Sequence, residues 1–284
     1  MLADERSSPD PAQDGANAQC RVHYETGFFA RGTAALVPLR FELLTIEFTE
    51  FIAAMANTIN VRGITLGDKL PDFAFDSSTG PSTLKTYFDG HWGVLFSHPD
   101  DYTPICTTEL GELARLDNLG EFKKRNTKVI GLSCNDVESH HGWIQDIEAF
   151  SGENVNYPII ADKNREIACQ LGMLSSDDLD KAGLPLTVRS VFVVGPDMAI
   201  KLALTYPAST GRNFVEILRV LDSLQMTAHH ACATPVNWVK GEKACIVPTV
   251  SNEAAATKFP KGFEVQSLPS GKGYLRFTPD PSSA

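Results

Sequence analysis

The sequence predicts an α/β fold in which helices flank one central sheet, and three observations point to it. Between residues 92 and 226, short apolar stretches typical of buried strands alternate with longer stretches whose apolar residues recur at helical spacing. Two strand-like stretches, 188–194 and 199–206, are joined by the turn residues 195–197. Residues 213–226 then form a predicted long helix with apolar residues along one side.

The elements of this pattern follow one another in a regular order. A lead-in strand and turn are expected at residues 64–75. The later strands are expected at residues 92–97, 127–134 and 157–161. The helices beside them are expected from Cys106 to about Arg125, at 136–150 and at 164–174. The chain shows no internal repeat that would change this interpretation.

The two ends of the chain differ from this region, which divides the sequence into three parts. Residues 1–60 form an N-terminal extension that we expect to be largely disordered, because residues 1–20 are rich in Ser, Pro, Asp, Ala and Gln. Residues 61–228 form the α/β domain. Residues 229–284 hold short apolar pieces separated by Pro and Gly. A segment of roughly 55 residues is marginal as an independent core, so it should pack on another surface.

Composition and charge exclude several classes of protein. The formal net charge of −10 argues against non-specific binding to nucleic acid or to an anionic membrane. No run of about 18 uncharged apolar residues occurs, so we expect no transmembrane segment. The six cysteines include no C-x-x-C pair, which argues against a dithiol redox motif or a zinc ribbon. Their scatter does not suggest a secreted disulfide framework, so we expect a reducing compartment, the cytoplasm.

The N-terminal extension leaves a second possibility for the location. Residues 1–54 contain eight acidic residues and four arginines, whereas a mitochondrial presequence is rich in Arg and poor in acids. Met55 stands just before the predicted domain and offers an alternative start. Residues 1–54 are therefore either absent from the mature protein or a segment that targets it to a mitochondrion or another organelle.

The predicted strand at residues 92–97 leads to a candidate reactive cysteine. The sequence from His98 to Asp101 ends the strand, Thr103 can cap a helix, and Pro104 suits its first position. Cys106 then falls in the first helical turn, where free N–H groups and the positive end of the helix dipole favour an anion. The thiolate is the nucleophilic form of cysteine. The alternative is a free cysteine that serves only as a small buried hydrophobe.

Residues 99–106 fit the pattern Pro-x-x-x-Thr-x-x-Cys, and through it the chain resembles the peroxiredoxins. The longer string from His98 to Glu109 resembles the 1-Cys peroxiredoxins of the peroxiredoxin-6 group, and the likeness covers roughly residues 62–281. The resemblance implies a thioredoxin-like central sheet and a C-terminal arm, residues 229–284, that packs across a partner subunit. A homodimer is therefore expected.

The resemblance also implies a set of site residues. Cys106 is the expected peroxidatic cysteine, Thr103 brings its hydroxyl near the sulfur, and Pro99 provides an apolar wall. Arg189 matches a family arginine at the start of a late strand, where a guanidinium would stabilise the thiolate and charge on the peroxide oxygens. Supporting roles are expected for His98, Glu109 and Arg212. Glu109 also suits a helix start for electrostatic reasons alone, and His98 could be a purely structural buried histidine.

The implied reaction is that of a thiol-dependent peroxidase in antioxidant defence. The Cys106 thiolate attacks hydrogen peroxide or an alkyl or lipid hydroperoxide and becomes a sulfenic acid. Two-Cys relatives keep a resolving cysteine in a Val-Cys-Pro segment, whereas this chain has Ala233-Thr-Pro235. An external thiol such as glutathione must then act as the reductant, and no other cofactor is expected. Cys232, just before that segment, is either a plain core cysteine or an atypical resolving cysteine.

Two rival functions are weighed against the peroxidase. The resembled group has a reported phospholipase activity that depends on a Gly-x-Ser-x-Gly-like element. Here His91 takes the place of the serine and Lys85 that of the histidine, so we predict that this activity is absent. A chaperone role is neither supported nor excluded by the sequence.

The remaining cysteines and histidines are expected to have no role in the chemistry. Cys134 and Cys169 stand among apolar residues and are expected to be buried, and Cys245 is similar. The pairs His140-His141 and His229-His230 are expected to be solvated, and we predict no metal site, because no third ligand stands at helical spacing.

Overall fold

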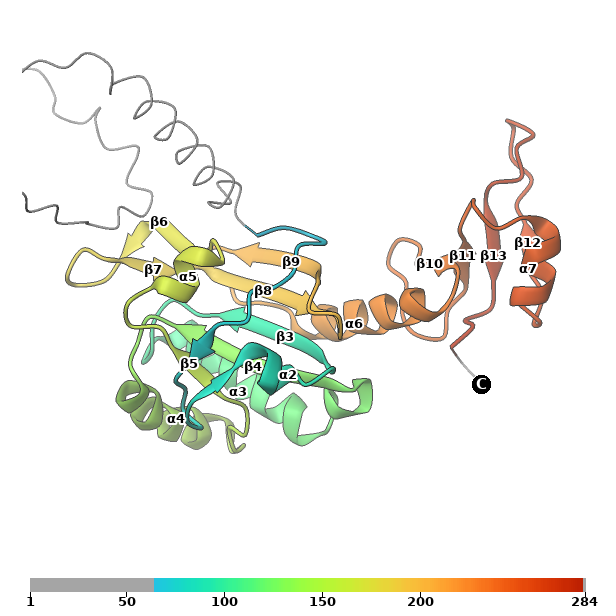
Figure 1. Cartoon of the computed structure of the whole chain (residues 1–284). Helices are drawn as coiled ribbons and strands as arrows, with labels where there is room; N and C mark the ends of the chain where they lie inside the picture. The colour runs from blue at the N-terminus through green and yellow to red at the C-terminus, as the bar shows by residue number, and fades with distance from the viewer. Residues whose placement is uncertain (1–63, 283–284) are drawn as a thin grey trace, which may run out of the picture. The chain divides into compact units, whose positions relative to one another are not determined.

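The computed structural model describes residues 64–282, so the predicted N-terminal extension lies outside the described residues. A five-stranded sheet with the strand order β5-β4-β3-β8-β9 forms the centre of the fold (Figure 1). Its strands are β3 (Trp92–Ser97), β4 (Thr127–Ser133), β5 (Ile159–Ala161), β8 (Arg189–Val194) and β9 (Ile200–Tyr206). β3, β4 and β5 run parallel, and β8 and β9 form an antiparallel hairpin beside β3. The predicted α/β class, central strands and hairpin are therefore confirmed.

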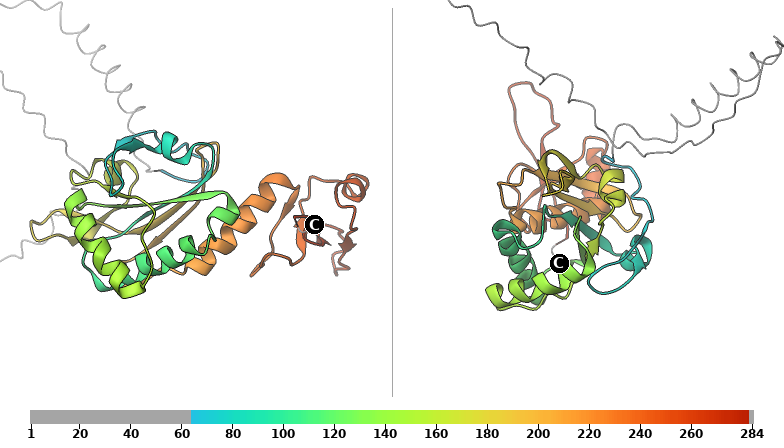
Figure 2. Two further views of the ribbon diagram at one scale, coloured as in Figure 1. Left: turned by 90° about the horizontal axis from the view of Figure 1, so that it is seen from below. Right: turned by 90° about the vertical axis from the view of Figure 1, so that its left-hand side faces the viewer.

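Helices cover both faces of this sheet, and its central strands β3 and β8 are therefore buried on both sides. Three long helices share one hydrophobic cluster with side chains of β3, β4 and β8. They are α3 (Pro104–Asn118), α4 (Val137–Ser151) and α6 (Phe214–His229). Residues of α2 (Leu84–Phe88) and α5 (Glu166–Gln170) belong to the cluster on the opposite face. Figure 2 shows the long helices gathered on one side of the sheet.

Two predicted helices are shorter than expected. The first ends at Asn118 instead of Arg125, because Gly120 takes a left-handed backbone conformation (φ 71°) and a separate 3-10 turn, η2 (Lys123–Arg125), follows. The second, predicted at residues 164–174, is limited to α5, and Gly172 (φ 65°) lies just beyond its end.

A hairpin that the sequence did not predict follows α5. It consists of β6 (Leu174–Leu179) and β7 (Pro185–Thr187), which pair antiparallel. The polar residues in the middle of β6 concealed the strand, because their side chains are largely exposed and give no apolar pattern. A second small antiparallel pair, β1 (Ala74–Phe75) with β2 (Ser82–Thr83), precedes α2; only β1 falls within the predicted lead-in segment.

The C-terminal region builds a small sheet of its own with the order β10-β11-β13-β12. Its elements are β10 (Cys232–Ala233), β11 (Ala244–Ile246), α7 (Asn252–Lys258), β12 (Glu264–Val265) and β13 (Arg276–Thr278). They enclose a hydrophobic cluster around the fully buried Trp238, to which α6 contributes Met226. Arg219 Nη1 in α6 donates to the Trp238 carbonyl oxygen (3.0 Å). We still propose the division at residues 228 and 229, which falls at the last turn of α6. No helix within residues 64–282 is long and apolar enough to cross a membrane.

Candidate active site

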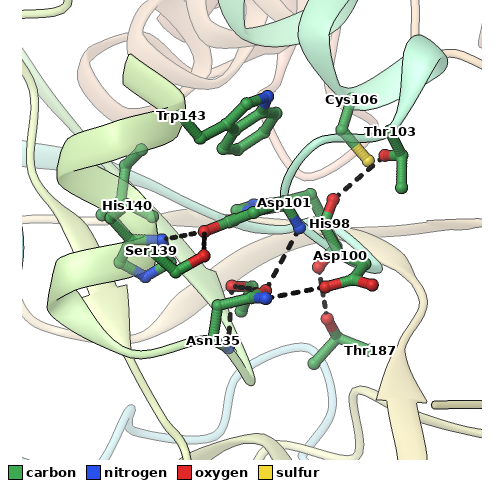
Figure 3. Close-up of polar contacts among 12 residues, drawn as sticks. His98, Asp100, Asp101, Thr103, Cys106, Asn135, Ser139, His140, Trp143 and Thr187 are labelled. Carbon is green, nitrogen blue, oxygen red and sulfur yellow. Dashed lines mark hydrogen bonds and ion pairs between the residues drawn. The ribbon is translucent and has the colours of Figure 1, made fainter. Parts of the chain in front are cut away.

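The candidate site lies where β3 ends and α3 begins (Figure 3). His98 and Pro99 follow β3 and are buried, and the chain turns at Tyr102 with a left-handed φ of 54°. Thr103 occupies the N-cap position of α3, and Pro104 opens the helix. The Thr103 hydroxyl makes no capping bond but donates to the Asp100 carbonyl oxygen (3.0 Å). The predicted helix start is therefore confirmed in its backbone, while the expected side-chain cap is not formed.

Cys106 lies in the first turn of α3 with no exposed surface. Arg189 Nη1 donates to its sulfur atom at 3.2 Å. Arg189 is the first residue of β8 and is 2 % exposed. Its Nε and Nη2 donate to the Ala208 carbonyl oxygen (3.0 and 2.7 Å), which fixes the plane of the guanidinium. The structure thus brings together a buried thiol and a buried, oriented cation from residues 83 positions apart.

Glu109 holds Arg189 and Arg212 together behind the sulfur. Its Oε2 accepts from Arg189 Nη1 (2.7 Å) and Arg212 Nη2 (2.8 Å), and its Oε1 accepts from Arg212 Nε (2.9 Å). Burial alone would raise the pKa of Glu109. The hydrogen bonds and charge of Arg212, together with the charge of Arg189, outweigh burial and lower the pKa below its ordinary value. An ionised Glu109 therefore balances one of the two guanidinium charges.

Arg212 is anchored further by the central strands. Its Nη1 donates to the carbonyl oxygens of Ser97 (2.8 Å) and Ser190 (3.0 Å). Its guanidinium also lies over the Phe96 ring, 5.1 Å from the ring centroid. Arg212 does not contact the Cys106 sulfur in the contacts described, so its effect on the thiol passes through Glu109 and Arg189.

Cys232 lies apart from this group. It belongs to the hydrophobic cluster of the C-terminal region, whereas Cys106 belongs to the cluster beneath α3, α4 and α6. Burial, with smaller contributions from Asp280 and Cys245, raises the pKa of the Cys232 thiol to about 11. A thiol that keeps its proton at neutral pH is a poor nucleophile. Within this chain Cys232 has the character of a core cysteine.

The other cysteines follow the predictions only in part. Cys134 is buried, and burial raises its pKa to about 12. Cys169 is partly exposed, so the prediction that it is buried was wrong. It lies on the short helix α5, where Ile167 and Ala168 take the buried positions. Cys245 is also partly exposed.

A network around Asp101 was missed by the sequence reasoning. Asp101 Oδ1 lies 2.8 Å from His98 Nε2, and its Oδ2 lies 2.8 Å from His140 Nδ1 and accepts from Ser139 Oγ (2.7 Å). His140 is fully buried, so the prediction that it is solvated was wrong, whereas its neighbour His141 is exposed. The spacing of His140, Trp143 and Ile147 on one face of α4 was the signal that could have placed His140 inside.

Comparisons with known proteins agree with this geometry. A model of the AhpC/TSA family matches residues 66–203, and a model of the C-terminal domain of 1-Cys peroxiredoxin matches residues 223–262. Peroxiredoxin-6 of Gallus gallus is 52% identical over 223 residues, which are 77% of this chain and 99% of that protein.

Solved structures give the same result. A crystal structure of a Cys-to-Ser mutant of the peroxiredoxin 6 of Arenicola marina shares 52% identity with a TM-score of 0.75, and the match covers 78% of this chain and all of that one. A yeast mitochondrial 1-Cys peroxiredoxin, solved to study thiol resolution through the glutathione and thioredoxin systems, shares 43% identity with a TM-score of 0.69 over 76% of this chain and 99% of that one. These likenesses confirm the thioredoxin-like architecture. The chain therefore belongs to the 1-Cys branch of the peroxiredoxin family, whose members are thiol-dependent peroxidases.

Proposed function

We propose that Cys106 is the peroxidatic cysteine of this peroxidase and that it reduces hydrogen peroxide and alkyl or lipid hydroperoxides. The observation that carries the proposal is the contact between Arg189 Nη1 and the Cys106 sulfur, 3.2 Å apart with both side chains buried. Arginine stays charged at every physiological pH, so it stabilises a thiolate beside it. The first turn of α3 adds the positive end of the helix dipole.

The proposed reaction uses one thiolate and one hydroperoxide. The Cys106 sulfur attacks the terminal oxygen, an S–O bond forms, and the O–O bond breaks. The leaving oxygen takes up a proton and departs as water or an alcohol, while Cys106 is oxidised to a sulfenic acid. Arg189 stabilises the negative charge that shifts onto the oxygens.

The neighbouring residues support this step in different ways. We propose that the Thr103 hydroxyl holds the peroxide and that buried Pro99 excludes water from the sulfur. Glu109 and Arg212 act through Arg189, because they fix where its guanidinium lies. His98 lies in the same loop and supports the site through its hydrogen bond to Asp101.

The sulfenic acid is reduced by an external thiol in this proposal. The attacking thiol forms a mixed disulfide with Cys106 and releases water, and a second thiol then restores the Cys106 thiol. The yeast relative whose resolution involves glutathione and thioredoxin supports a thiol reductant such as glutathione. The raised pKa of Cys232 and its position in a separate hydrophobic cluster argue against Cys232 as the resolving residue.

A turnover assay tests the proposal. Consumption of hydrogen peroxide and of an alkyl hydroperoxide is measured with glutathione or dithiothreitol for the full chain and for Cys106→Ser. We expect the variant to lose activity by about three orders of magnitude, because Arg189 donates to the Cys106 sulfur, whereas burial raises the pKa values of the Cys134 and Cys232 thiols. Cys232→Ser is the matched control and should stay within about twofold.

The other results of this assay are equally informative. Activity that survives in Cys106→Ser would contradict the proposal. Loss of turnover in Cys232→Ser would make the enzyme an atypical 2-Cys peroxidase. Protection of a client protein from aggregation by both forms, without peroxidase activity in either, would favour the chaperone role.

Phospholipase activity is still expected to be absent. His91, in the place of the serine nucleophile, directs Nδ1 to the carbonyl oxygens of Phe88 (2.9 Å) and Asp89 (3.0 Å). Release of fatty acid by the pure protein, sensitive to serine-directed inhibitors, would contradict this expectation.

The C-terminal region supports the proposal of a homodimer. Four of its apolar side chains are about half exposed or more, namely Val236 (87%), Val239 (50%), Val265 (47%) and Tyr274 (58%). Large apolar side chains that stay this exposed in a small region favour burial against a partner. Light scattering behind size-exclusion chromatography should give twice the chain mass, and a monomer at micromolar concentration would contradict the proposal. We propose a cytoplasmic location, and N-terminal sequencing of protein from the native source tests whether residues 1–54 direct it elsewhere.

A further inference from the structure

His140, in the first turn of α4, lies between two hydrogen-bond acceptors. Its side chain has no exposed surface. Nδ1 is 2.8 Å from Asp101 Oδ2, and Nε2 is 3.2 Å from the carbonyl oxygen of Ile160 in β5. Figure 3 shows the ring reaching from α4 toward Asp101. A carbonyl oxygen only accepts hydrogen bonds, so the nitrogen that faces Ile160 needs a proton of its own.

Asp101 presents only acceptor atoms to the second nitrogen. Burial alone would raise the pKa of Asp101, but its hydrogen bonds with His140 and His98 outweigh burial and lower the pKa below its usual range. The carboxylate also accepts from Ser139 Oγ (2.7 Å). An ionised carboxylate that is 4 % exposed needs a positive charge nearby.

His98 does not supply that positive charge. Burial lowers the pKa of His98 and outweighs the hydrogen bond and charge of Asp101, which act to raise it; the positive charge of Arg212 acts in the same direction as burial. Nε2 faces Asp101, and Nδ1 is buried without a hydrogen-bond partner among residues 64–282. His98 is therefore a neutral ring that donates through Nε2. Besides Asp101 and the neutral His98, the titratable group that acts on His140 is Asp136, the N-cap residue of α4.

We propose that His140 is doubly protonated in the folded protein and is a positioning residue for the peroxidatic site. Its imidazolium and the Asp101 carboxylate form a buried ion pair that ties α4 to the loop at residues 98–103, which carries the chain into Cys106. The meaning of this pair for catalysis rests on the proposed function of Cys106. In Figure 3 His140 approaches Asp101 from the left, and Thr103 and Cys106 lie to the right of Asp101.

Asn135 holds the same part of the loop through other atoms. Its Oδ1 accepts from Asp101 N (3.2 Å), and its Nδ2 donates to Asp100 Oδ1 (2.7 Å). Tyr102, between this anchor and Thr103, has a left-handed φ that side chains rarely adopt. Such a conformation persists only where surrounding contacts hold it, and Asn135 and the ion pair supply them.

The ion pair then controls access to the sulfur. Cys106 has no exposed surface, so a large external thiol can reach it only when residues 98–103 move. A movement that separates Asp101 from His140 leaves a buried charge without its partner, which makes opening rare. Loss of one charge-assisted hydrogen bond is expected to raise the open population roughly tenfold.

Nuclear magnetic resonance of the ring nitrogens tests the protonation state directly. The full chain is labelled with ¹⁵N-histidine, and the signals of its seven histidines are assigned by single substitution. At about pH 7.5 both nitrogens of His140 should show the imidazolium signature, and His98 should show one protonated and one bare nitrogen. A neutral His140 ring would overturn the proposal. The nitrogen signals do not depend on which cysteine reacts, so this experiment tests the protonation of His140 independently of the proposed role of Cys106.

A pair of variants tests the positioning role. His140→Gln removes the charge but keeps a donor for Asp101, and His141→Gln changes the exposed neighbour on the same helix. The rate at which dithiobis-nitrobenzoate modifies Cys106, followed by peptide mapping, should rise roughly tenfold in His140→Gln and stay unchanged in His141→Gln. The rate with hydrogen peroxide should change less, because that molecule is small. Equal modification rates in two variants with matched unfolding midpoints would overturn the proposal.

Discussion

Two buried thiols, Cys106 and Cys232, show how the surroundings of a cysteine decide its chemistry. They are 0% and 4% exposed, so burial does not separate them. Cys106 stands at the start of a 15-residue helix with a guanidinium 3.2 Å from its sulfur. Cys232 stands in a two-residue strand, and the charged group that acts on it is the carboxylate of Asp280. Burial alone makes a thiol inert, whereas burial beside a fixed cation prepares a nucleophile.

The largest effect is expected when the cation is removed from Cys106. Arg189→Met keeps the aliphatic stem but removes the charge, and kcat/KM with hydrogen peroxide should fall about 100-fold. The kcat/KM of Arg189→Lys should lie between those of the unmodified protein and of Arg189→Met. One ammonium keeps a charge but cannot bond the sulfur, Glu109 and the Ala208 carbonyl together. Arg115→Met, on the exposed face of α3, is the control. A change of less than about threefold in Arg189→Met would show that the cation does not activate the thiol.

A second prediction concerns the stability of the site. Glu109→Gln leaves two buried guanidinium groups without their shared carboxylate, so the free energy of unfolding should fall by about 3 kcal/mol. Glu112→Gln, on the exposed side of the same helix, breaks a surface pair with Arg115 and should cost less than about 1 kcal/mol. Urea unfolding measures both values. Equal losses would mean that the buried pair contributes no more than a surface pair.

The smallest predicted effect is a pH dependence that comes from His98. Its pKa in the folded protein is lowered, so the unfolded chain binds a proton that the folded protein resists. The contribution of His98 to stability should therefore be greatest above pH ~6.5 and decline as the pH falls below it, by at most about 1.4 kcal/mol per pH unit for one group. The lowered pKa of Asp101 adds a further loss in more acidic solution. His98→Gln should flatten the slope between about pH 7 and 5, whereas a slope as steep as that of the unmodified chain would contradict this assignment.

The parts of the site that the sequence predicted are those close together in the chain. Pro99, Thr103 and Cys106 form one local motif, and the strand and helix around them follow from apolar patterning. Arg189 lies 83 residues from Cys106, and Arg212 lies 103 residues from Glu109, so only resemblance to a family could place them. Their positions depend on strand order in the sheet, which periodicity does not reveal.

The missed features share a different cause. His140 was predicted to be solvated because no third metal ligand stands at helical spacing, but its contacts with Ile160 in β5 and with Asp101 depend on tertiary structure. The hairpin β6–β7 was missed because its exposed polar residues resemble a loop. Both cases show that polar residues carry little pattern of their own, whether they are buried with partners or exposed on a strand.

One measurement tests the central claim most directly. Reduced full-length protein is treated with one equivalent of hydrogen peroxide in the presence of dimedone, and every cysteine is mapped by mass spectrometry. The account predicts a dimedone adduct on Cys106 and unmodified Cys232, because Arg189 donates a hydrogen bond to the Cys106 sulfur, whereas burial raises the pKa of the Cys232 thiol. If Cys106 remains reduced while Cys232 or another cysteine is oxidised, the claim that Arg189 and α3 activate Cys106 is contradicted.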